Sequence, residues 1–208
     1  MGTEKVLIFG SCPCSSWDFL DSLRADSRLV ICADGGLRCA RDAGFRPQAY
    51  IGDGDSGGAP ESDLNCRILP CEKDWTDLEA AWMWASEQGC RDFVMTACTG
   101  GRQDHTLAAA GLLELAAERG QRARILDPRN EIVCLLPGRH ALHPAGYRYF
   151  SLIPLDKTLE DVSMTGAKYS VSHATIRRGT SLGVSNEPLD GPVHLSIGSG
   201  ACLLIYSK

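Results

Sequence analysis

Short apolar runs alternate with amphipathic stretches through the first part of the chain. Runs of strand length are followed by segments in which apolar residues recur at helical spacing. The expected strands are residues 6–9, 29–33, 49–51, 67–69, 93–97 and 124–126, and the expected helices are 17–23, 37–43, 76–89 and 104–119. Strand and helix alternate from residue 5 to about residue 127, which predicts an open, mostly parallel α/β sheet with helices on both faces.

One helix start carries its own sequence signal. In the segment Thr76-Asp77-Leu78-Glu79, a threonine is followed three residues later by a glutamate. This is the pattern of a capping box, in which the threonine hydroxyl accepts a hydrogen bond from an exposed amide of the first turn. The sequence therefore predicts that this helix begins directly after Thr76.

The pattern changes at about residue 138, where helical periodicity disappears. Glycine, proline and serine now separate short runs of β type, which with one earlier run cover residues 132–136, 147–153, 168–172, 174–177, 193–197 and 201–206. Such runs are typical of a small antiparallel sandwich or barrel. We expect two domains, residues 1–130 and 131–208, with no low-complexity linker between them.

Composition and charge exclude several classes of protein. The 208 residues carry a formal net charge of −5, whereas a general nucleic-acid or membrane-surface role needs a basic patch. No apolar run approaches membrane-spanning length, and residues 1–9 lack the long apolar stretch of a signal peptide. We expect a cytoplasmic protein whose ten cysteines are reduced thiols.

Four acidic or glycine-rich clusters, each placed after an expected strand, carry the candidate chemistry. They are Asp34-Gly35-Gly36, Gly52-Asp53-Gly54-Asp55-Ser56, Lys73-Asp74-Trp75-Thr76-Asp77 and Gly100-Gly101-Arg102-Gln103-Asp104-His105. The carboxyl ends of the strands of an open parallel sheet line one crevice, so the four clusters are expected to converge there. Together they favour an enzyme that uses a nucleotide.

The acidic residues are candidates for binding a divalent metal. Asp53 and Asp55 are two residues apart in an extended segment, so both carboxylates can face one ion. Mg²⁺ takes one or two carboxylates together with substrate phosphates. Asp74 and Asp77 bracket the expected helix start, and Lys73 beside them suits a triphosphate. The alternatives are a solvated Asp-Gly turn for the first pair and partners of the helix dipole for the second.

Gly100, Gly101 and Arg102 are candidates for binding phosphate. Glycines allow a phosphate to approach the backbone, the start of the next helix offers free amides, and the arginine can hold phosphate oxygens. An ordinary glycine-rich turn is the alternative. The chain contains neither G-x-x-x-x-G-K-[ST] nor G-x-G-x-x-G, which disfavours P-loop kinases and dinucleotide dehydrogenases.

Taken in order, the four clusters resemble those of the thiamin pyrophosphokinase family. That family shows D-G-G, G-D-x-D-S, D-x-T-D at a helix start and G-G-R-x-D-H, and the chain has each of them in turn. Lys168-Tyr169 and Ser185-Asn186 are similar to elements of its C-terminal part, so the resemblance covers nearly the whole chain. The family usually has a bulky residue where the chain has Gly54.

The resemblance implies an α/β ATP-binding catalytic domain followed by a thiamin-binding β-sandwich, in a homodimer that binds thiamin where the subunits meet. The reaction would move the β,γ-pyrophosphoryl group of ATP to the hydroxyl of thiamin and release AMP. It would use Mg²⁺, held by Asp53, Asp55 and Asp77. The ATP and phosphate site would comprise Asp34, Gly35, Gly36, Ser56, Lys73, Gly101, Arg102, Asp104 and His105. The thiamin site would comprise Asp74, Tyr169, Ser185 and Asn186.

Two other functions remain open on the same scaffold. One is a different ATP-dependent transferase, and a simple kinase of this kind would release ADP rather than AMP. The other is a non-catalytic nucleotide-binding regulator. A regulator is expected to lose its metal-binding carboxylates, yet Asp53, Asp55 and Asp77 are all present.

Overall fold

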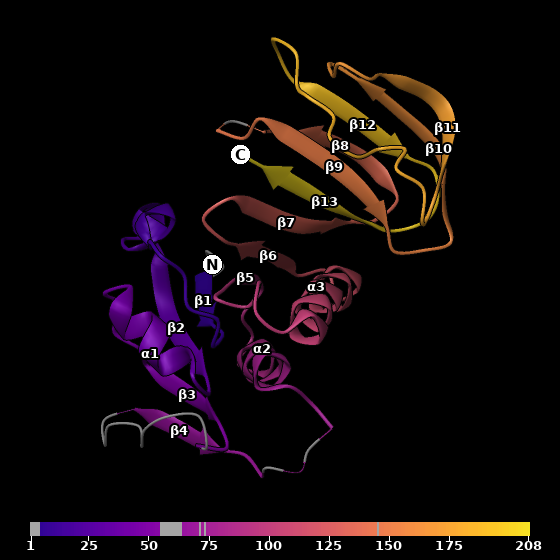
Figure 1. Ribbon diagram of the computed structural model, residues 1–208. Helices are drawn as coiled ribbons and strands as arrows, with labels where there is room; N and C mark the ends of the chain where they lie inside the picture. The colour runs from indigo at the N-terminus through magenta and orange to yellow at the C-terminus, as the bar shows by residue number, and fades with distance from the viewer. Residues whose placement is uncertain (1–4, 55–63, 71, 73, 145) are drawn as a thin grey trace. The chain divides into compact units, whose positions relative to one another are not determined.

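A computed structural model describes residues 5–54, 64–70, 72, 74–144 and 146–208, which are coloured in Figure 1. The chain forms two compact units, Met1–Pro128 and Arg129–Lys208. Three residues of the expected site, Asp55, Ser56 and Lys73, lie outside the described part of the chain. None of the described helices is long and apolar enough to cross a membrane.

The first unit is built on six parallel strands in the order β4-β3-β2-β1-β5-β6. The strands are β1 (Lys5–Phe9), β2 (Ser27–Ala33), β3 (Ala49–Gly52), β4 (Asn65–Ile68), β5 (Asp92–Thr96) and β6 (Arg122–Leu126). The first four strands follow one another in one direction from β1, and β5 and β6 continue on its other side. The order therefore reverses between β1 and β5, which makes their carboxyl ends the topological switch point of the sheet.

Helices cover both faces of this sheet (Figure 1). They are the 3-10 helix η1 (Asp18–Leu23), α1 (Gly36–Asp42), α2 (Asp77–Glu87) and α3 (Gln103–Glu118). Leu7 and Phe9 of β1 share a buried cluster with Leu20 of η1 and Leu37 of α1. The helix α2 contacts β1, β2 and β3 but contributes nothing to that cluster, so it covers the opposite face. Burial on both faces explains why β1 and β5 read as continuous apolar runs.

The second unit is an antiparallel sandwich. One layer pairs β13 (Cys202–Ser207) with β7 (Asn130–Leu135) on one side and β9 (Tyr149–Pro154) on the other. The other layer has the order β11-β10-β12-β8, from β11 (Val171–Arg177), β10 (Thr158–Thr165), β12 (Val193–Ile197) and β8 (Gly138–Leu142). Alternate residues of both layers point into one core, which includes Phe150, Leu204, Met164 and Leu195.

The expected fold class, a mostly parallel α/β part followed by an antiparallel β part, is confirmed. Several elements of the second unit differ from expectation. Residues 138–142 and 158–165 form strands that the pattern did not predict, and the two runs at 168–172 and 174–177 give a single strand, Val171–Arg177. In β10 the pairing with β11 shifts between Leu159 and Val162 and again before Met164. These bulges break the two-residue alternation by which strands are predicted.

Candidate active site at the switch point of the sheet

A cavity of about 420 Å³ lies at the carboxyl ends of β1, β2 and β5 and at the amino ends of α2 and α3. It is lined by Gly10, Ser11, Cys12, Pro13, Ala33, Asp34, Thr76, Asp77, Leu78, Ala97, Cys98, Gly100, Gly101, Arg102, His105 and Ala109. Three of the four expected clusters therefore meet in one cavity, as convergence at the switch point predicts.

The backbone is strained where two of these strands end. Asp34 after β2 has φ 43° and Ala97 after β5 has φ 54°, although neither residue is glycine. Gly10 after β1 lies so close to β5 that a Cβ atom there would be 2.5 Å from the Ala97 carbonyl oxygen. Such strained positions cluster at functional sites, where they fix the direction of side chains and carbonyls.

The Asp34 carboxylate is held by a buried hydrogen bond. The Tyr50 hydroxyl donates to Asp34 Oδ1 at 2.7 Å. Burial is the main cause that raises the pKa of Tyr50, and the bond to Asp34 raises it further, so the phenol stays a donor. Gly52 makes room for the pair, since a Cβ atom there would be 2.8 Å from Asp34 Cβ and 2.9 Å from the Tyr50 hydroxyl. The cavity thus gains a carboxylate in a fixed position.

The start of α2 brings Asp77 to the cavity. The predicted cap is confirmed, since Thr76 Oγ1 accepts a hydrogen bond from the Glu79 amide at 3.2 Å and α2 begins at Asp77. Asp77 interacts with other groups of the protein. Within the described part of the chain, however, no hydrogen-bond donor reaches its buried Oδ1 atom. This oxygen of the cavity wall is the kind of atom that suits a cation.

The turn before α3 presents glycine backbone and a guanidinium group. Gly100 and Gly101 are both left-handed, with φ 85° and 61°. Arg102 Nη2 lies 2.6 Å from Asp104 Oδ2, and Arg102 Nε lies 3.2 Å from Oδ1. This two-point contact, more than any other cause, lowers the pKa of Asp104 to about 2. Both side chains are exposed, so the guanidinium is oriented by Asp104 yet open to a ligand.

Among the described residues of the α/β unit, the predicted residues Gly35, Gly36, Asp53, Asp74 and Asp104 are not part of the cavity lining. Gly36 is buried, and a Cβ atom there would be 2.0 Å from the Phe9 carbonyl oxygen, so its visible role is to let α1 pack against β1. Asp53 is half-buried at the end of β3, and Asp74 is exposed before α2. Their expected contacts, like that of Gly35, stay predictions.

The expected metal site also stays a prediction. Among the described residues, no group of three or more acidic, histidine or cysteine side chains is arranged to hold a metal ion. Asp55, one of the three expected ligands, lies outside these residues, as do Ser56 and Lys73. Asp77 is the expected ligand that lines the cavity.

One wall of the cavity was missing from the sequence prediction. It is the segment Gly10-Ser11-Cys12-Pro13, which follows β1 directly. The Gly10 amide donates to the Thr96 carbonyl at 2.8 Å, and the Cys12 amide donates to the Ala97 carbonyl at 2.8 Å. The position of Gly10 at the end of the first apolar run was the available signal, because that strand also ends at the crevice.

In the second unit, the predicted residue Asn186 holds backbone together. It is 3% exposed. Its Oδ1 accepts from the amides of Tyr169 at 3.0 Å and Glu187 at 2.9 Å, and its Nδ2 donates to the Tyr169 carbonyl at 2.9 Å. The observed role of Asn186 is thus to fix the segment that carries Tyr169. Its expected contact with thiamin stays a prediction.

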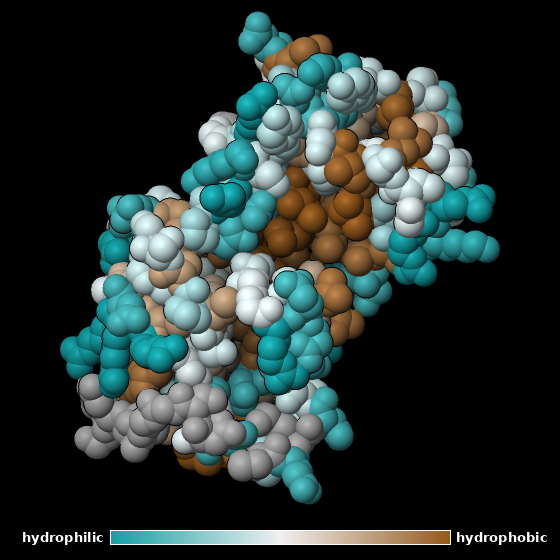
Figure 2. All heavy atoms as spheres, viewed as in Figure 1, coloured by the Kyte–Doolittle hydropathy of each residue, from teal (hydrophilic) through white to brown (hydrophobic). Residues whose placement is uncertain are grey.

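Tyr169 and Ser185 are more open than Asn186. The Tyr169 side chain is 60% exposed, and the Lys168 Nζ atom lies 5.6 Å from its ring centroid and 2.6 Å from Glu187 Oε1. Ser185 is left-handed, with φ 57°, and its amide donates to Ser151 Oγ at 2.9 Å. Figure 2 shows hydrophobic side chains gathered in the region of β9 and β13 on one face of this unit.

Comparison with known proteins connects both units to one group of enzymes. Residues 20–125 match the model of the thiamin pyrophosphokinase catalytic domain, and residues 139–202 match that of the thiamin pyrophosphokinase vitamin B1 binding domain. A thiamine pyrophosphokinase of Bacillus subtilis is 31% identical over 186 residues, which are 86% of this chain and 87% of that protein.

Solved structures agree with the sequence matches. The crystal structure of thiamine pyrophosphokinase from Bacillus subtilis has a TM-score of 0.85 at 28% identity and covers 98% of this chain and 99% of that chain. The enzyme from Geobacillus thermodenitrificans has a TM-score of 0.84 at 33% identity, with 98% and 97% covered. The enzyme from Candida albicans, at 16% identity, shares the fold with a TM-score of 0.80 and covers 99% of this chain and 90% of that chain.

Proposed function

The chain belongs to the thiamin pyrophosphokinase family, and we propose on that premise that the cavity at the switch point binds the phosphates of ATP. Thiamin pyrophosphokinase is an ATP-using activity. In it, the β,γ-pyrophosphoryl group passes to the hydroxyl of thiamin and AMP leaves. The observation that carries our proposal is that Asp34, Asp77, Gly101 and Arg102 line one cavity at the carboxyl edge of the sheet.

Arg102 and the start of α3 supply the positive side of the site. The first amides of a helix have no partner within the helix, and they point toward an anion placed at its amino end. Arg102 stands at the position before α3 and makes no side-chain cap there. We assign its guanidinium to the phosphate oxygens, with Asp104 holding it in orientation. Because transfer passes through a loose transition state, fixed donors of this kind matter more than a covalent step.

The acidic side of the site fits Mg²⁺. Carboxylate oxygens are hard ligands, and Mg²⁺ takes one or two of them together with substrate phosphates. Asp77 would hold it together with Asp53 and Asp55. When bound, the ion would neutralise phosphate charge during transfer. A carboxylate of this group that is not occupied by the metal can accept the proton of the thiamin hydroxyl.

We assign thiamin to the second unit. Tyr169 is exposed, and an aromatic face attracts a cationic ring such as the thiazolium of thiamin. Asn186 would act by fixing the segment of Tyr169, and Ser185 would contact the pyrimidine. We extend the proposal to a homodimer in which thiamin binds where subunits meet. Analytical ultracentrifugation should give twice the 22.4 kDa mass of one chain, and a single-chain mass would contradict it.

The activity is tested by following every product of one incubation. Purified protein with ATP, Mg²⁺ and thiamin should release AMP and thiamin diphosphate in equal amounts, and omission of thiamin should stop AMP release. ADP in place of AMP would mean a simple kinase. Nucleotide binding without any product would mean a regulator. Titration of ATP against thiamin-free protein tests the cavity assignment separately from turnover.

A further inference from the structure

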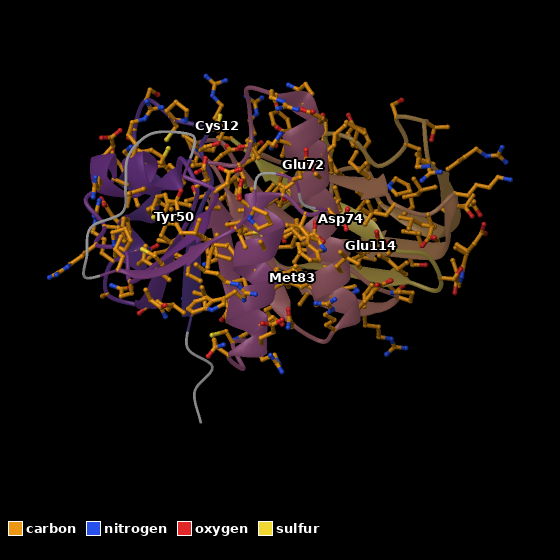
Figure 3. The ribbon with its side chains drawn as sticks, turned by 90° about the horizontal axis from the view of Figure 1, so that it is seen from below. Cys12, Tyr50, Glu72, Asp74, Met83 and Glu114 are labelled. Atoms are coloured by element: carbon orange, nitrogen blue, oxygen red, sulfur yellow. The ribbon has the colours of Figure 1, made fainter. Side chains whose placement is uncertain are left out.

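A thiol forms part of the cavity wall beside the phosphate-binding turn. Cys12 lies in the loop after β1 and lines the cavity, at one end of the α/β unit (Figure 3). Its Sγ atom is 3.4 Å from the position that a Cβ atom would occupy on Gly100, and 3.7 Å from the same position on Gly101. A group attached to this sulfur would therefore stand over the turn that leads into α3.

Cys12 is not an isolated thiol. Cys98 lines the same cavity, and the Cys12 amide bonds to the carbonyl of Ala97, the residue before Cys98. Cys14 and Cys39 are neighbours of Cys12. Burial is the main cause that raises the pKa of each of these two thiols, and Cys12 raises both further. Their sulfurs are less available, since Cys14 Sγ donates to the Ser16 carbonyl at 2.9 Å, Cys39 is buried, and burial raises the pKa of Cys98 to about 12.

Two features make Cys12 the member of this cluster suited to reaction. Its side chain is partly exposed, as are those of Cys14 and Cys98, whereas Cys39 is buried. Among the described residues, the only hydrogen-bond contact of the Cys12 thiol is a 4.0 Å approach of Sγ to the Pro13 carbonyl, which is too long to hold the thiol. The cavity, which is large enough for a phosphate chain, gives a small reagent access to this sulfur.

We propose that Cys12 is a modification site for low-molecular-weight disulfides such as oxidised glutathione, and that the adduct closes the cavity to ATP. The Cys12 thiolate attacks one sulfur of the disulfide, a new S–S bond forms, and the old S–S bond breaks. The Cys12 sulfur is oxidised, and the second glutathione is reduced and leaves as a thiolate that takes up a proton. A thiol reductant reverses the exchange.

The consequence for binding follows from space and charge. A tripeptide attached to Cys12 would occupy much of a cavity of about 420 Å³. Its carboxylates would lie near Arg102 and the start of α3, where they would compete with phosphate. The inference rests on the proposed ATP site. It adds that the site can be turned off reversibly by the thiol–disulfide balance.

The test combines peptide mapping with nucleotide binding on the full chain. The protein is incubated with oxidised glutathione, with and without ATP and Mg²⁺, and adducts are located by tandem mass spectrometry. Cys12 and Cys14 share the tryptic peptide 6–24, so Cys14 is an internal control, and exposed Cys66 on β4 is an external one. ATP affinity is measured by calorimetry before treatment, after it, and after dithiothreitol.

We expect the Cys12 adduct to form faster than those at Cys14 and Cys66, and ATP to slow it by about fivefold or more. ATP affinity should fall by about tenfold or more and recover with dithiothreitol, and Cys12→Ser should lose this response while Cys14→Ser keeps it. An adduct at Cys12 that forms no faster than at Cys66, or that leaves ATP affinity unchanged, would overturn the inference. If untreated protein binds no ATP, the ATP assignment itself fails, and selective labelling then supports the thiol site alone.

Discussion

The polar side chains of the two units have different roles: those of the α/β unit line a cavity, and that of Asn186 in the β unit holds backbone. In the α/β unit, Asp77 and Arg102 stand at the starts of α2 and α3, where both line a cavity. In the β unit, the amide of Asn186 is committed to backbone groups of Tyr169 and Glu187. Substitutions in the first unit should therefore damage chemistry more than folding, and the substitution of Asn186 should damage folding and, through it, binding.

The largest effect is expected for Asp77→Asn. The change keeps the volume and removes a charge from the cavity, so kcat should fall by about 100-fold or more while the melting temperature changes little. Steady-state kinetics with ATP and thiamin and thermal unfolding would be measured together. Asp92→Asn removes the charge of a carboxylate that is paired with exposed Arg122 at the start of β5; it is the matched control and should retain activity. Retained activity in Asp77→Asn would mean that the charge of Asp77 is not needed for the reaction.

Asn186→Ala should have the opposite effect, a loss of stability that is accompanied by weaker thiamin binding. It removes the partners that Asn186 gives to part-buried backbone groups of Tyr169 and Glu187, which should cost about 2–4 kcal/mol in the free energy of unfolding. KM for thiamin should rise while KM for ATP stays the same. Ser185→Ala separates a direct contact from a structural role, because a rise in KM for thiamin without a loss of stability would identify a direct contact. An unchanged unfolding midpoint in Asn186→Ala would refute the scaffold role.

Arg102→Ala should lower the affinity for ATP by about tenfold, the loss expected for a charge-assisted contact with phosphate. It should leave KM for thiamin unchanged. The pKa of Asp104 gives a second readout. Arg102 lowers this pKa from 3.8 to about 2, so the ion pair is complete above the ordinary pKa and is lost as the pH falls through about 2. NMR titration of the Asp104 carboxyl carbon should show the pKa rise toward 3.8 in the variant. Equal losses for both substrates would contradict an ATP-facing role.

Thr76→Ala should have the smallest effect. It removes the cap of α2, and the free energy of unfolding should fall by about 1 kcal/mol in chemical denaturation. Thr175→Ala in the β unit, where the hydroxyl donates to Glu160 at the surface, is the control and should stay within about 0.5 kcal/mol. If kcat falls although the variant remains folded under the assay conditions, the cap also sets the position of Asp77.

The sequence predicted best what depends on neighbours in the chain. The cap at Thr76 was found where expected, and α1, expected over residues 37–43, spans Gly36–Asp42, two residues before Gly44 with φ 72°. The strand β10 escaped prediction because its bulges near Glu160 and Asp161 interrupt the alternation of apolar residues. The segment at Lys168 and Tyr169 resembled a strand, but it is held by Asn186, which is distant in the sequence.

The site was predictable only in part, for a similar reason. Asp34, Asp77, Gly101 and Arg102 carry recognisable chemistry, and a parallel sheet gathers such residues at one edge. The loop from Gly10 to Pro13 carries no motif, and it joins the cavity because β1 lies next to β5. Strand order results from packing across the whole unit, which a single sequence does not display.

The place of β13 has a consequence for how the chain is made. This strand, Cys202–Ser207, lies between β7 and β9 and pairs with both, yet it is synthesised after both of them. The α/β unit is complete at Pro128 and can form while translation continues, since domains generally fold as units from the amino end. The layer of β7 and β9 can close only after β13 has left the ribosome, and until then the backbone groups of β7 and β9 that pair with β13 are exposed.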